Sequence, residues 1–352
     1  MSDLGQWDVH GRVETLRTEW GEWDKAKNDW QPSKRRTSGR FRPDGQISGT
    51  EAFNPDGSVA RRAYLYNEAG QILEARFQVN DGPVGKTITS YDGDGRIVRT
   101  IKIDEKGVSS EFEIYRYDSG GRKTRIRFLP KVEGTMSYSV DVEGAVALFG
   151  ANGAATMTTV YDARGQATEI LVHDTAHRLL RRTTVTQDSA GRMVKQEVHA
   201  GTAPVFPGFE SNLKDAPPDA RESLQAALAA AFGPNNVLVT VTNTYDEKGR
   251  RVERSMMMGT LGGDRTTFRF DDHDNPIEEN SEHTSRDVGM EQDNPRYSNQ
   301  TANQQHTRFV YKYDAEGNWI EREVWTNFEP GGDLKRSSIE RRQITYYPPE
   351  PR

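Results

Sequence analysis

A tight turn with the pattern Tyr-Asp-x-x-Gly-Arg recurs along most of this chain and constrains its fold more than any other feature. The Asp side chain can accept a local backbone N–H, and Gly adopts positive φ without a Cβ penalty. Each copy therefore predicts a hairpin tip. The copy at Asp271 has Asp274 in place of Gly and should be the weakest turn. The other copies start at Trp7, Tyr66, Tyr91, Tyr117, Tyr161, Gln187, Tyr245 and Tyr313.

The residues between the turns have the period of β-strands. Aromatic residues precede several turns two positions apart, as Tyr64 and Tyr66 do, which places both on one face of a strand. Where the repeat is uninterrupted, as from Tyr66 to Tyr91 and from Tyr91 to Tyr117, the copies lie 25 or 26 residues apart with a further turn signal between them, so one repeat is two strands and two turns. Parallel pairing would need longer connections. The spacing thus predicts an antiparallel meander.

Composition limits how thick the core can be. Only 34% of the 352 residues are hydrophobic, and the mean hydropathy is -0.85. An antiparallel sheet can bury one face and leave the other in water, and a repeat array needs contacts only between neighbouring units. We therefore expect an all-β protein, a long curved antiparallel β-meander of about 16 to 22 strands with one inserted short α-helix.

Three interruptions of the repeat define the expected domain organisation. The helix is predicted from Leu224, Leu228 and Phe232, which recur every four residues among alanines. It should cover part of the sheet or dock a partner. The expected segments are a repeat region at 1–202 with a loop insertion at 129–157, a Pro-rich insertion at 203–237 with the helix at 219–232, and a second repeat region at 238–352 with a disordered loop at 279–306.

Charge and cysteine content exclude several classes of partner and site. The 47 basic and 53 acidic residues are interspersed and give a net charge of -6, which argues against nucleic acid as a partner. The absence of cysteine excludes disulfides, thiolate nucleophiles and cysteine metal sites. No apolar stretch approaches the ~18 residues of a membrane helix, so no membrane span is expected.

The sequence contains no motif that indicates catalysis or a cofactor. The turn aspartates recur wherever the backbone turns, whereas a catalytic pair is needed once, so we assign them to conformation. His173 and His177 have the spacing of zinc ligands on a helix, but the apolar residues before them favour a strand that enters a turn. We expect no catalytic residue, no cofactor and no metal site.

Aromatic residues near both ends of the chain are the candidate ligand-binding residues. The tryptophans near the start of the chain, Trp20, Trp23 and Trp30, either cap the first repeat or form a platform on which sugars stack. The pair near the other end, Trp319 and Trp325, has the same two interpretations. The predicted residues are Tyr311, Tyr313, Trp319, Trp325, Trp20, Trp23 and Trp30.

The repeat resembles the tyrosine-aspartate (YD) repeats of the rearrangement-hotspot (RHS) family, over roughly two thirds of the chain. Long arrays of that family coil into a β-shell around a toxic cargo, which implies a curved antiparallel sheet. This chain is short for such a shell and lacks the family's Asp-Pro-x-Gly-Leu-like core. It looks more like the short stand-alone repeat proteins of bacterial envelopes. Many of these open with the phrase Leu-x-Gly-x-Val, which Leu4-Gly5 and Gly11-Arg12-Val13 loosely match.

The expected function is a non-enzymatic binding or scaffold module of the bacterial cell envelope or exterior, with a polysaccharide or a protein as its ligand. The expected location is periplasmic, cell-surface or secreted, with a leader absent from this chain, and a cytoplasmic location stays open. Two alternatives are a polysaccharide-degrading lyase or hydrolase and a toxin-associated RHS-like shell component. The oligomeric state is left open.

Overall fold

The computed structural model of the chain describes residues 3–129, 137–142, 145–150, 154–201, 237–259, 262–285, 303–327 and 331–348. Within these ranges the secondary structure consists of one short 3-10 helix, η1 (Leu4–Trp7), and β-strands. Twenty strands belong to one sheet, and their registers are antiparallel. The all-β antiparallel prediction is therefore confirmed. The helix expected at 219–232 lies outside the described residues. No helix in the described part has the length and apolar character that a membrane crossing requires.

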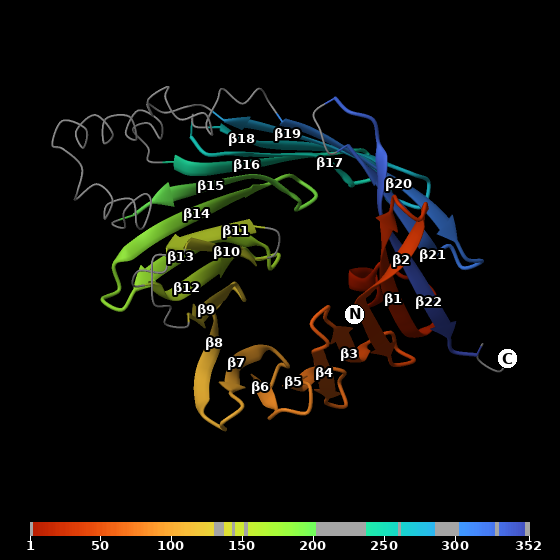
Figure 1. Cartoon of the computed structure of the whole chain (residues 1–352). Helices are drawn as coiled ribbons and strands as arrows, with labels where there is room; N and C mark the ends of the chain where they lie inside the picture. Colours follow the sequence, from red (N-terminus) through yellow and green to blue (C-terminus); the bar gives the residue numbers. More distant parts are fainter. Residues whose placement is uncertain are drawn as a thin grey trace, which may run out of the picture. The chain divides into compact units, whose positions relative to one another are not determined.

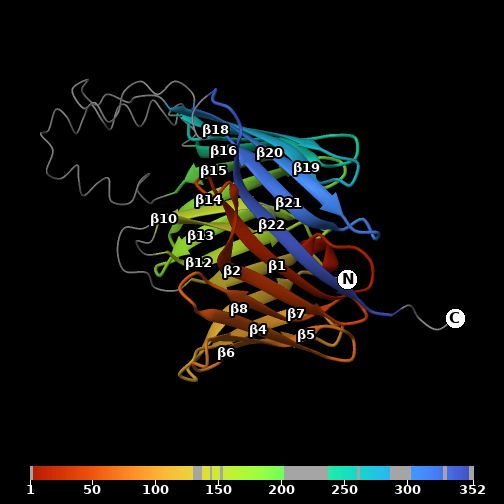
Figure 2. The same cartoon turned by 45° about the vertical axis from the view of Figure 1, so that its right-hand side comes forward.

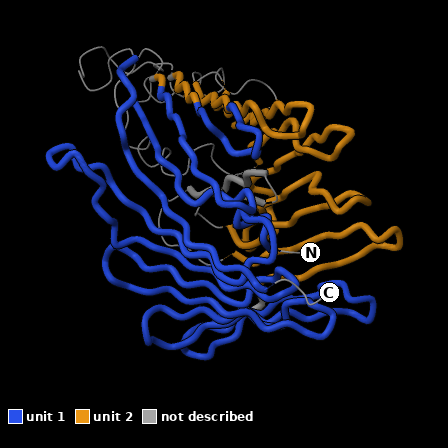
Figure 3. The backbone as a smooth tube through the Cα atoms, turned by 90° about the vertical axis from the view of Figure 1, so that its right-hand side faces the viewer, with its two compact units in different colours: residues 1–111, 269–279, 305–352 blue, residues 112–268, 280–304 orange. Residues whose placement is uncertain are grey.

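The chain divides into two compact units, coloured separately in Figure 3. Unit 1 comprises residues 1–111, 269–279 and 305–352, and therefore contains both ends of the chain. Consecutive pairing connects its strands. In pairing order they are β20 (Asn303–Tyr313), β21 (Trp319–Thr326), β22 (Lys335–Tyr346), β1 (Val13–Asp24), β2 (Asp29–Phe41), β3 (Ile47–Phe53), β4 (Val59–Tyr66), β5 (Ile72–Val79), β6 (Gly85–Tyr91) and β7 (Ile97–Ile103).

Unit 2 comprises residues 112–268 and 280–304. Its strands also pair in succession, and Figure 2 shows β12 to β16 following one another. They are β8 (Ser109–Tyr117), β9 (Lys123–Phe128), β12 (Ala154–Tyr161), β13 (Ala167–Asp174), β14 (Leu179–Gln187), β15 (Met193–Ala200), β16 (Val237–Tyr245), β17 (Arg251–Met257) and β18 (Gly262–Phe270). β19 (Pro276–Ser285) crosses the division and pairs with β20.

The two expected loops contain strands. Within 129–157, β10 (Ser137–Val142) and β11 (Ala145–Gly150) form a separate two-stranded sheet. Within 279–306, residues up to Ser285 continue β19, and β20 begins at Asn303. Strands thus occupy most of the described residues in both expected loops.

The first and last strands of the chain are neighbours, which a simple meander does not provide. β1 pairs with β2 on one side and with β22 on the other, from Val13 opposite Tyr346 to Glu22 opposite Ser338. Figure 1 shows β1 and β22 lying side by side. A meander with two free ends would leave both strands as edges open to further pairing. Their pairing removes these two edges from unit 1.

The geometry of the turn explains why the motif contains Asp, Gly and Arg. At Asp92 the Gly95 N–H donates to the Asp92 carbonyl at 3.0 Å, and Gly95 has φ +76°. One Asp92 carboxylate oxygen, Oδ1, accepts the backbone N–H groups of Asp94 and Arg96, and the other, Oδ2, accepts the Arg96 Nε–H at 2.8 Å. The same Arg-to-Asp bond forms in the turns at Asp118, Asp174, Asp188 and Asp246.

The motif tyrosine connects several of the hairpins to the preceding one, as at Tyr66, Tyr91 and Tyr245. The Tyr66 hydroxyl donates to the Ile47 carbonyl at 2.6 Å, and the Tyr91 hydroxyl donates to the Ile72 carbonyl at 2.9 Å. Burial raises the pKa of Tyr66 to about 12, so the hydroxyl stays a donor at neutral pH. Where Gln replaces the motif Arg, as at Gln71, its amide reaches the Gly95 carbonyl of the next turn at 2.7 Å.

Two turns depart from the expected pattern. At the first copy, Asp8 follows η1, has φ +51° and donates its N–H to the Gly5 carbonyl, so the chain makes a helical turn there. Conversely, Asp174 to Arg178 forms the repeat turn although His177 stands in the glycine position with φ +60°. The motif pattern misses this copy because it requires Gly.

We expect Asp274→Gly to raise the free energy of unfolding by about 1 kcal/mol. Asp274 has φ +64°, and its N–H lies 3.3 Å from the Asp271 carbonyl, against 3.0 Å at Gly95. A residue with a Cβ pays a steric cost in this left-handed region that Gly avoids. Urea unfolding of the variant and of the wild type measures the difference. A variant that is less stable than the wild type would show that Asp274 itself stabilises the turn.

Each unit has its own small hydrophobic cluster. Val9, Val13, Leu16, Phe41 and Ile47 pack together in unit 1. Met157, Ile170, Val172 and Leu180 pack together in unit 2. Among the described residues, further buried hydrophobic side chains such as Val198 and Val241 lie outside these clusters, so burial is spread along the sheet and supplemented by the hydrogen bonds of the turns.

Candidate functional site

Trp319, a predicted ligand-binding residue, is buried where the two ends of the chain meet. Only 3% of its surface is exposed, and its Nε1–H donates to Asp8 Oδ2 at 2.7 Å. The Arg342 guanidinium lies 3.4 Å from the centroid of its ring and donates to the Asp8 carbonyl at 2.9 Å. Burial lowers the pKa of Arg342 to about 10. Trp319 therefore joins β21 and β22 to the N-terminal turn and offers almost no surface to a ligand.

Tyr311 and Tyr313 also have internal partners. The Tyr311 hydroxyl donates to the Pro276 carbonyl at 2.9 Å, and the Tyr313 hydroxyl donates to Asp271 Oδ2. The His273 ring stacks on Tyr313 with centroids 4.0 Å apart. A lyase could use such a Tyr–His pair as acid and base, but burial and the Asp271 carboxylate raise the pKa of Tyr313. That direction opposes the deprotonated form which a catalytic base requires.

The other four aromatic residues are only partly buried. Trp20 is covered by the Arg35 guanidinium, which lies 4.6 Å from its ring centroid. Trp23 and Trp30 are opposite each other on β1 and β2, with ring centroids 5.0 Å apart. Trp325 lies on β21, and the Arg336 guanidinium of β22 lies over both the Trp23 ring and the Trp325 ring. The structure thus brings Trp23, Trp30 and Trp325 together and places Trp319 elsewhere.

The turn carboxylates are engaged in local structure. Both oxygens of Asp92, for example, accept hydrogen bonds within the turn. Within the described ranges no group of three His, Asp or Glu side chains could hold a metal ion. His177 occupies the glycine position of a turn, which explains its spacing from His173 without a metal.

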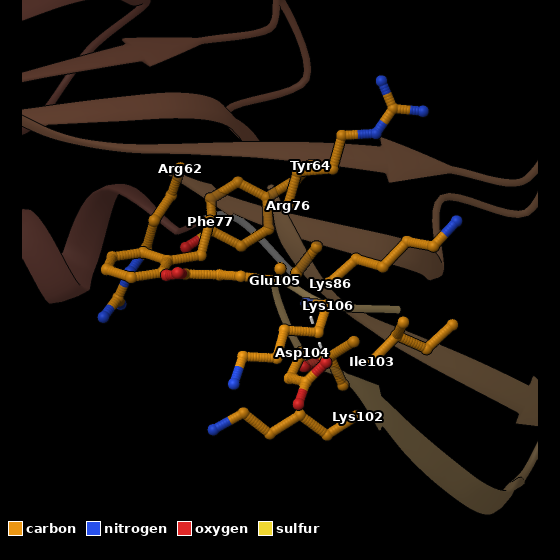
Figure 4. Close-up of a pocket in the computed structure, with 13 residues that line it drawn as sticks. Arg62, Tyr64, Arg76, Phe77, Lys86, Lys102, Ile103, Asp104, Glu105 and Lys106 are labelled. Atoms are coloured by element: carbon orange, nitrogen blue, oxygen red, sulfur yellow. Dashed lines mark hydrogen bonds between the residues drawn. The ribbon is translucent and has the colours of Figure 1, made fainter. Parts of the chain in front are cut away.

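A hollow on unit 1, above β4 to β7, is the candidate binding site (Figure 4). Its cavity volume is about 720 Å³, within the range of small-ligand sites. Cross-strand pairing places Tyr64, Ala75, Thr87 and Lys102 in one row. Because the middle two side chains are small, the space between Tyr64 and Lys102 stays open. Gly85, opposite Phe77, widens it further.

Cationic and aromatic side chains converge on one side of this hollow. Figure 4 shows Arg62, Phe77, Lys102 and Lys106 extending toward the same side, together with Glu105. The Phe77 ring is 38% exposed, and the Arg62 guanidinium lies 5.8 Å from its centroid. Among the described residues, Arg62, Lys102 and Lys106 form no ion pair. Asp104 is engaged in its own turn, where it accepts the Lys106 and Val108 N–H groups.

Two other cations at the hollow belong to the opposite face of the sheet. Arg76 and Lys86 both pair with Glu74, at 2.5 Å and 3.6 Å. Their side chains point away from Lys102 and Lys106 in Figure 4. Alternation along β5 and β6 explains this, since neighbouring residues in a strand point to opposite faces. As far as the described residues show, the positive charge of the hollow that is not in an ion pair is therefore carried by Arg62, Lys102 and Lys106.

Unit 2 has a smaller cavity of about 370 Å³ beside the turn at Asp118. Arg122, which lines it, is already paired with Asp118 at 2.7 Å. Lys123 lies 3.8 Å from the ring centroid of Tyr161. Arg122 and Lys123 thus have local partners, which leaves Arg116 as the third cation of this lining, so the hollow on unit 1 offers more positive charge outside ion pairs among the described residues.

None of the residues that line this hollow was predicted from the sequence to bind a ligand. Arg62, Phe77 and Lys102 look like ordinary strand residues, and Ala75 and Gly85 carry no motif. The available signal was the cluster of cations in residues 99–106 beside the exposed Phe77. It becomes specific only when the strand register places these positions together.

Comparison with known proteins yields structural matches alone. No family model and no curated protein matches the chain. A porin-like protein from Bacteroides uniformis matches 95% of this chain and 96% of its own, with 9% identity and a TM-score of 0.37. A porin-like protein from Bacteroides vulgatus matches 77% and 94%, with 13% identity and a TM-score of 0.29. The resemblance to YD-repeat proteins therefore stays a prediction from the motif.

The expectation that the chain has no membrane span is corrected at this point. That expectation rested only on apolar stretches long enough for a helix, whereas most of the residues that the structure describes form strands. Strands as well as helices can cross a membrane, so the helix criterion was the wrong test for this chain.

Proposed function

We propose that this protein is a non-enzymatic binding module of the bacterial envelope whose ligand is an acidic polysaccharide, bound in the hollow above β4 to β7. The observation that carries the proposal is the set of three cations around the exposed Phe77 ring that form no ion pair with any described residue. The envelope location follows the resemblance to short YD-repeat proteins.

The side chains of the hollow match the chemistry of a uronic acid chain. Lys102, Lys106 and Arg62 supply charge for carboxylates, and an ammonium or guanidinium bonded to a carboxylate forms a strong hydrogen bond. The exposed Phe77 ring can pack against the C–H face of a sugar ring. The half-buried Tyr64 adds a hydroxyl for the polar edge of the sugar. A binding role is also consistent with turn aspartates whose oxygens are engaged within the turns.

We expect Lys102→Gln with Lys106→Gln to weaken the binding of galacturonate oligomers at least about tenfold. A lost charged hydrogen bond costs on the order of 1.5 to 3 kcal/mol, and 1.4 kcal/mol corresponds to tenfold in Kd. Isothermal titration calorimetry measures Kd. Binding by the wild type should weaken as salt is added, because salt screens exposed charges.

Arg76→Gln with Lys86→Gln is the matched control. Like the first double variant it removes two positive charges, but from the opposite face of the sheet, where both side chains pair with Glu74. It should leave Kd within about twofold of the wild-type value. Equal losses in both double variants would show that only net charge matters. Equally tight binding of dextran would remove the acidic class, and equally tight binding of polyglutamate would favour an acidic protein as the ligand.

A further inference from the structure

Residues from four strands of unit 1 form a row in which an arginine lies between indole rings. The Arg336 guanidinium on β22 lies 4.5 Å from the ring centroid of Trp23 on β1 and 5.0 Å from that of Trp325 on β21. Trp30 on β2 packs edge-on against Trp23. Residues that are more than 300 positions apart in the sequence thus form one site. We call Trp30, Trp23, Arg336 and Trp325 the Trp–Arg row.

The hydrogen-bonding capacity of Arg336 is largely unused. Its nearest carboxylate is Glu323, with 4.0 Å between Arg336 Nε and Glu323 Oε2. Glu323 Oε2 also accepts the Trp325 Nε1–H at 3.3 Å. Within the described residues the buried Nε of Arg336 has no hydrogen-bond partner. A guanidinium carries five N–H donors in its plane, so most of them remain available.

The Arg336 guanidinium carbon lies over both the Trp23 ring and the Trp325 ring. Cation–π contacts use the flat face of the group, whereas its N–H donors point outward in the plane. The rings also fix the orientation of the guanidinium, which reduces the ordering cost when a planar anion binds. The Arg336 side chain is 38% exposed, so part of it is accessible from solvent although its Nε is buried. A carboxylate is the planar anion that matches such a fork with two parallel hydrogen bonds.

We propose that Arg336, held by Trp23 and Trp325, is a second binding site for a carboxylate of the polymer. This inference rests on the proposed function for its choice of ligand. Arg308, whose guanidinium lies 5.8 Å from the Trp325 ring centroid, adds positive charge beside the row. Arg336 contacts the carboxylate, and Trp23 and Trp325 are positioning residues.

Arg336→Lys is the discriminating variant, because it keeps the charge and removes the fork. We expect it to weaken the binding of galacturonate oligomers about tenfold. Arg341→Lys is the matched control, since Arg341 lies on the same strand and is paired with Glu321 at 2.9 Å. It should bind as the wild type does. An Arg336→Lys variant with wild-type Kd overturns this inference.

A readout on the folded wild type removes any dependence on how well the variant folds. Titration with galacturonate oligomers should shift the NMR signals of the Arg336 Nε–H and of the Trp23 and Trp325 Nε1–H, and leave that of the buried Trp319 unchanged. Unchanged Arg336 and Trp325 signals at saturation overturn the inference.

The outcomes separate the two proposals. If the wild type binds no acidic oligomer, both fail. If the Lys102/Lys106 double variant binds weakly and Arg336→Lys binds normally, only the second site fails. If Arg336→Lys binds weakly and the double variant matches its own control, the hollow is not the site and the Trp–Arg row stands.

Discussion

Replacing Trp319 with alanine is expected to lower the free energy of unfolding by about 3–5 kcal/mol, the range for truncating a buried aromatic side chain. The ring is 3% exposed and packs against Arg342 and Tyr311. Its loss also removes the hydrogen bond to Asp8. Because many domains are stable by only 5–15 kcal/mol, this loss is a large fraction of the total. Urea unfolding followed by circular dichroism measures it.

Two further variants show what this loss consists of. Trp319→Phe keeps a ring and removes the donor, so it should cost about 1–3 kcal/mol for the unpaired group. A double-mutant cycle of Trp319→Phe and Arg342→Lys isolates the coupling between the two side chains, which share Asp8. A Trp319→Ala variant within 1 kcal/mol of the wild type would contradict the assignment of Trp319 as the link between the chain ends.

Acid should unfold the protein through its turns. Hydrogen bonds from the backbone N–H groups of Arg96 and Arg178 hold the pKa values of Asp92 and Asp174 below their ordinary value. The backbone N–H of Arg122 lowers the pKa of Asp118 in the same way. A pKa that is lower in the folded state adds stability above the unfolded value near 3.9, and this stability is lost as pH falls through the folded value. Urea midpoints should therefore be constant from about pH 7 to 5 and fall below about pH 4.

The turn at Asn67, which uses uncharged side chains, shows how to design a control for this pH dependence. At Asn67 the side-chain oxygen accepts the Gln71 N–H at 2.8 Å, and the Asn67 amide donates to the Gln71 side chain at 2.8 Å, without any charge. Asp92→Asn with Arg96→Gln converts the neighbouring turn to this type. The variant should lose part of the acid sensitivity and keep its fold. A wild-type midpoint that is unchanged down to pH 3 would contradict the role of the charged turns.

Local features of the fold were predictable because they are encoded within a few residues. Asp92, Gly95 and Arg96 form their turn from contacts four residues apart or fewer, and each copy repeats them. The pairing of Val13 with Tyr346 joins residues that are far apart in the sequence, and no short motif in either strand identifies the partner strand. The antiparallel all-β class was thus accessible from the sequence, and the joining of the chain ends was not.

The candidate sites were predictable only in part. Aromatic residues pointed to Trp23 and Trp325, yet the same reasoning selected Trp319, which is buried. Residue type alone does not tell which face of a strand carries each ring, and the register shift between Val324 and Trp325 changes the alternation there. The hollow above β4 to β7 depends on small side chains at Ala75 and Gly85, and small residues give no signal of their own.

The pairing of β1 with β22 imposes an order on biosynthesis. Thr15 and Thr345 share a hydrogen bond across 330 positions, so the first strand leaves the ribosome long before its second neighbour exists. During that interval one edge of β1 is an open template for any other extended chain. Contacts of such sequence separation also form slowly. Nascent molecules of this protein should therefore depend on chaperones that shield strand edges until β22 has left the ribosome.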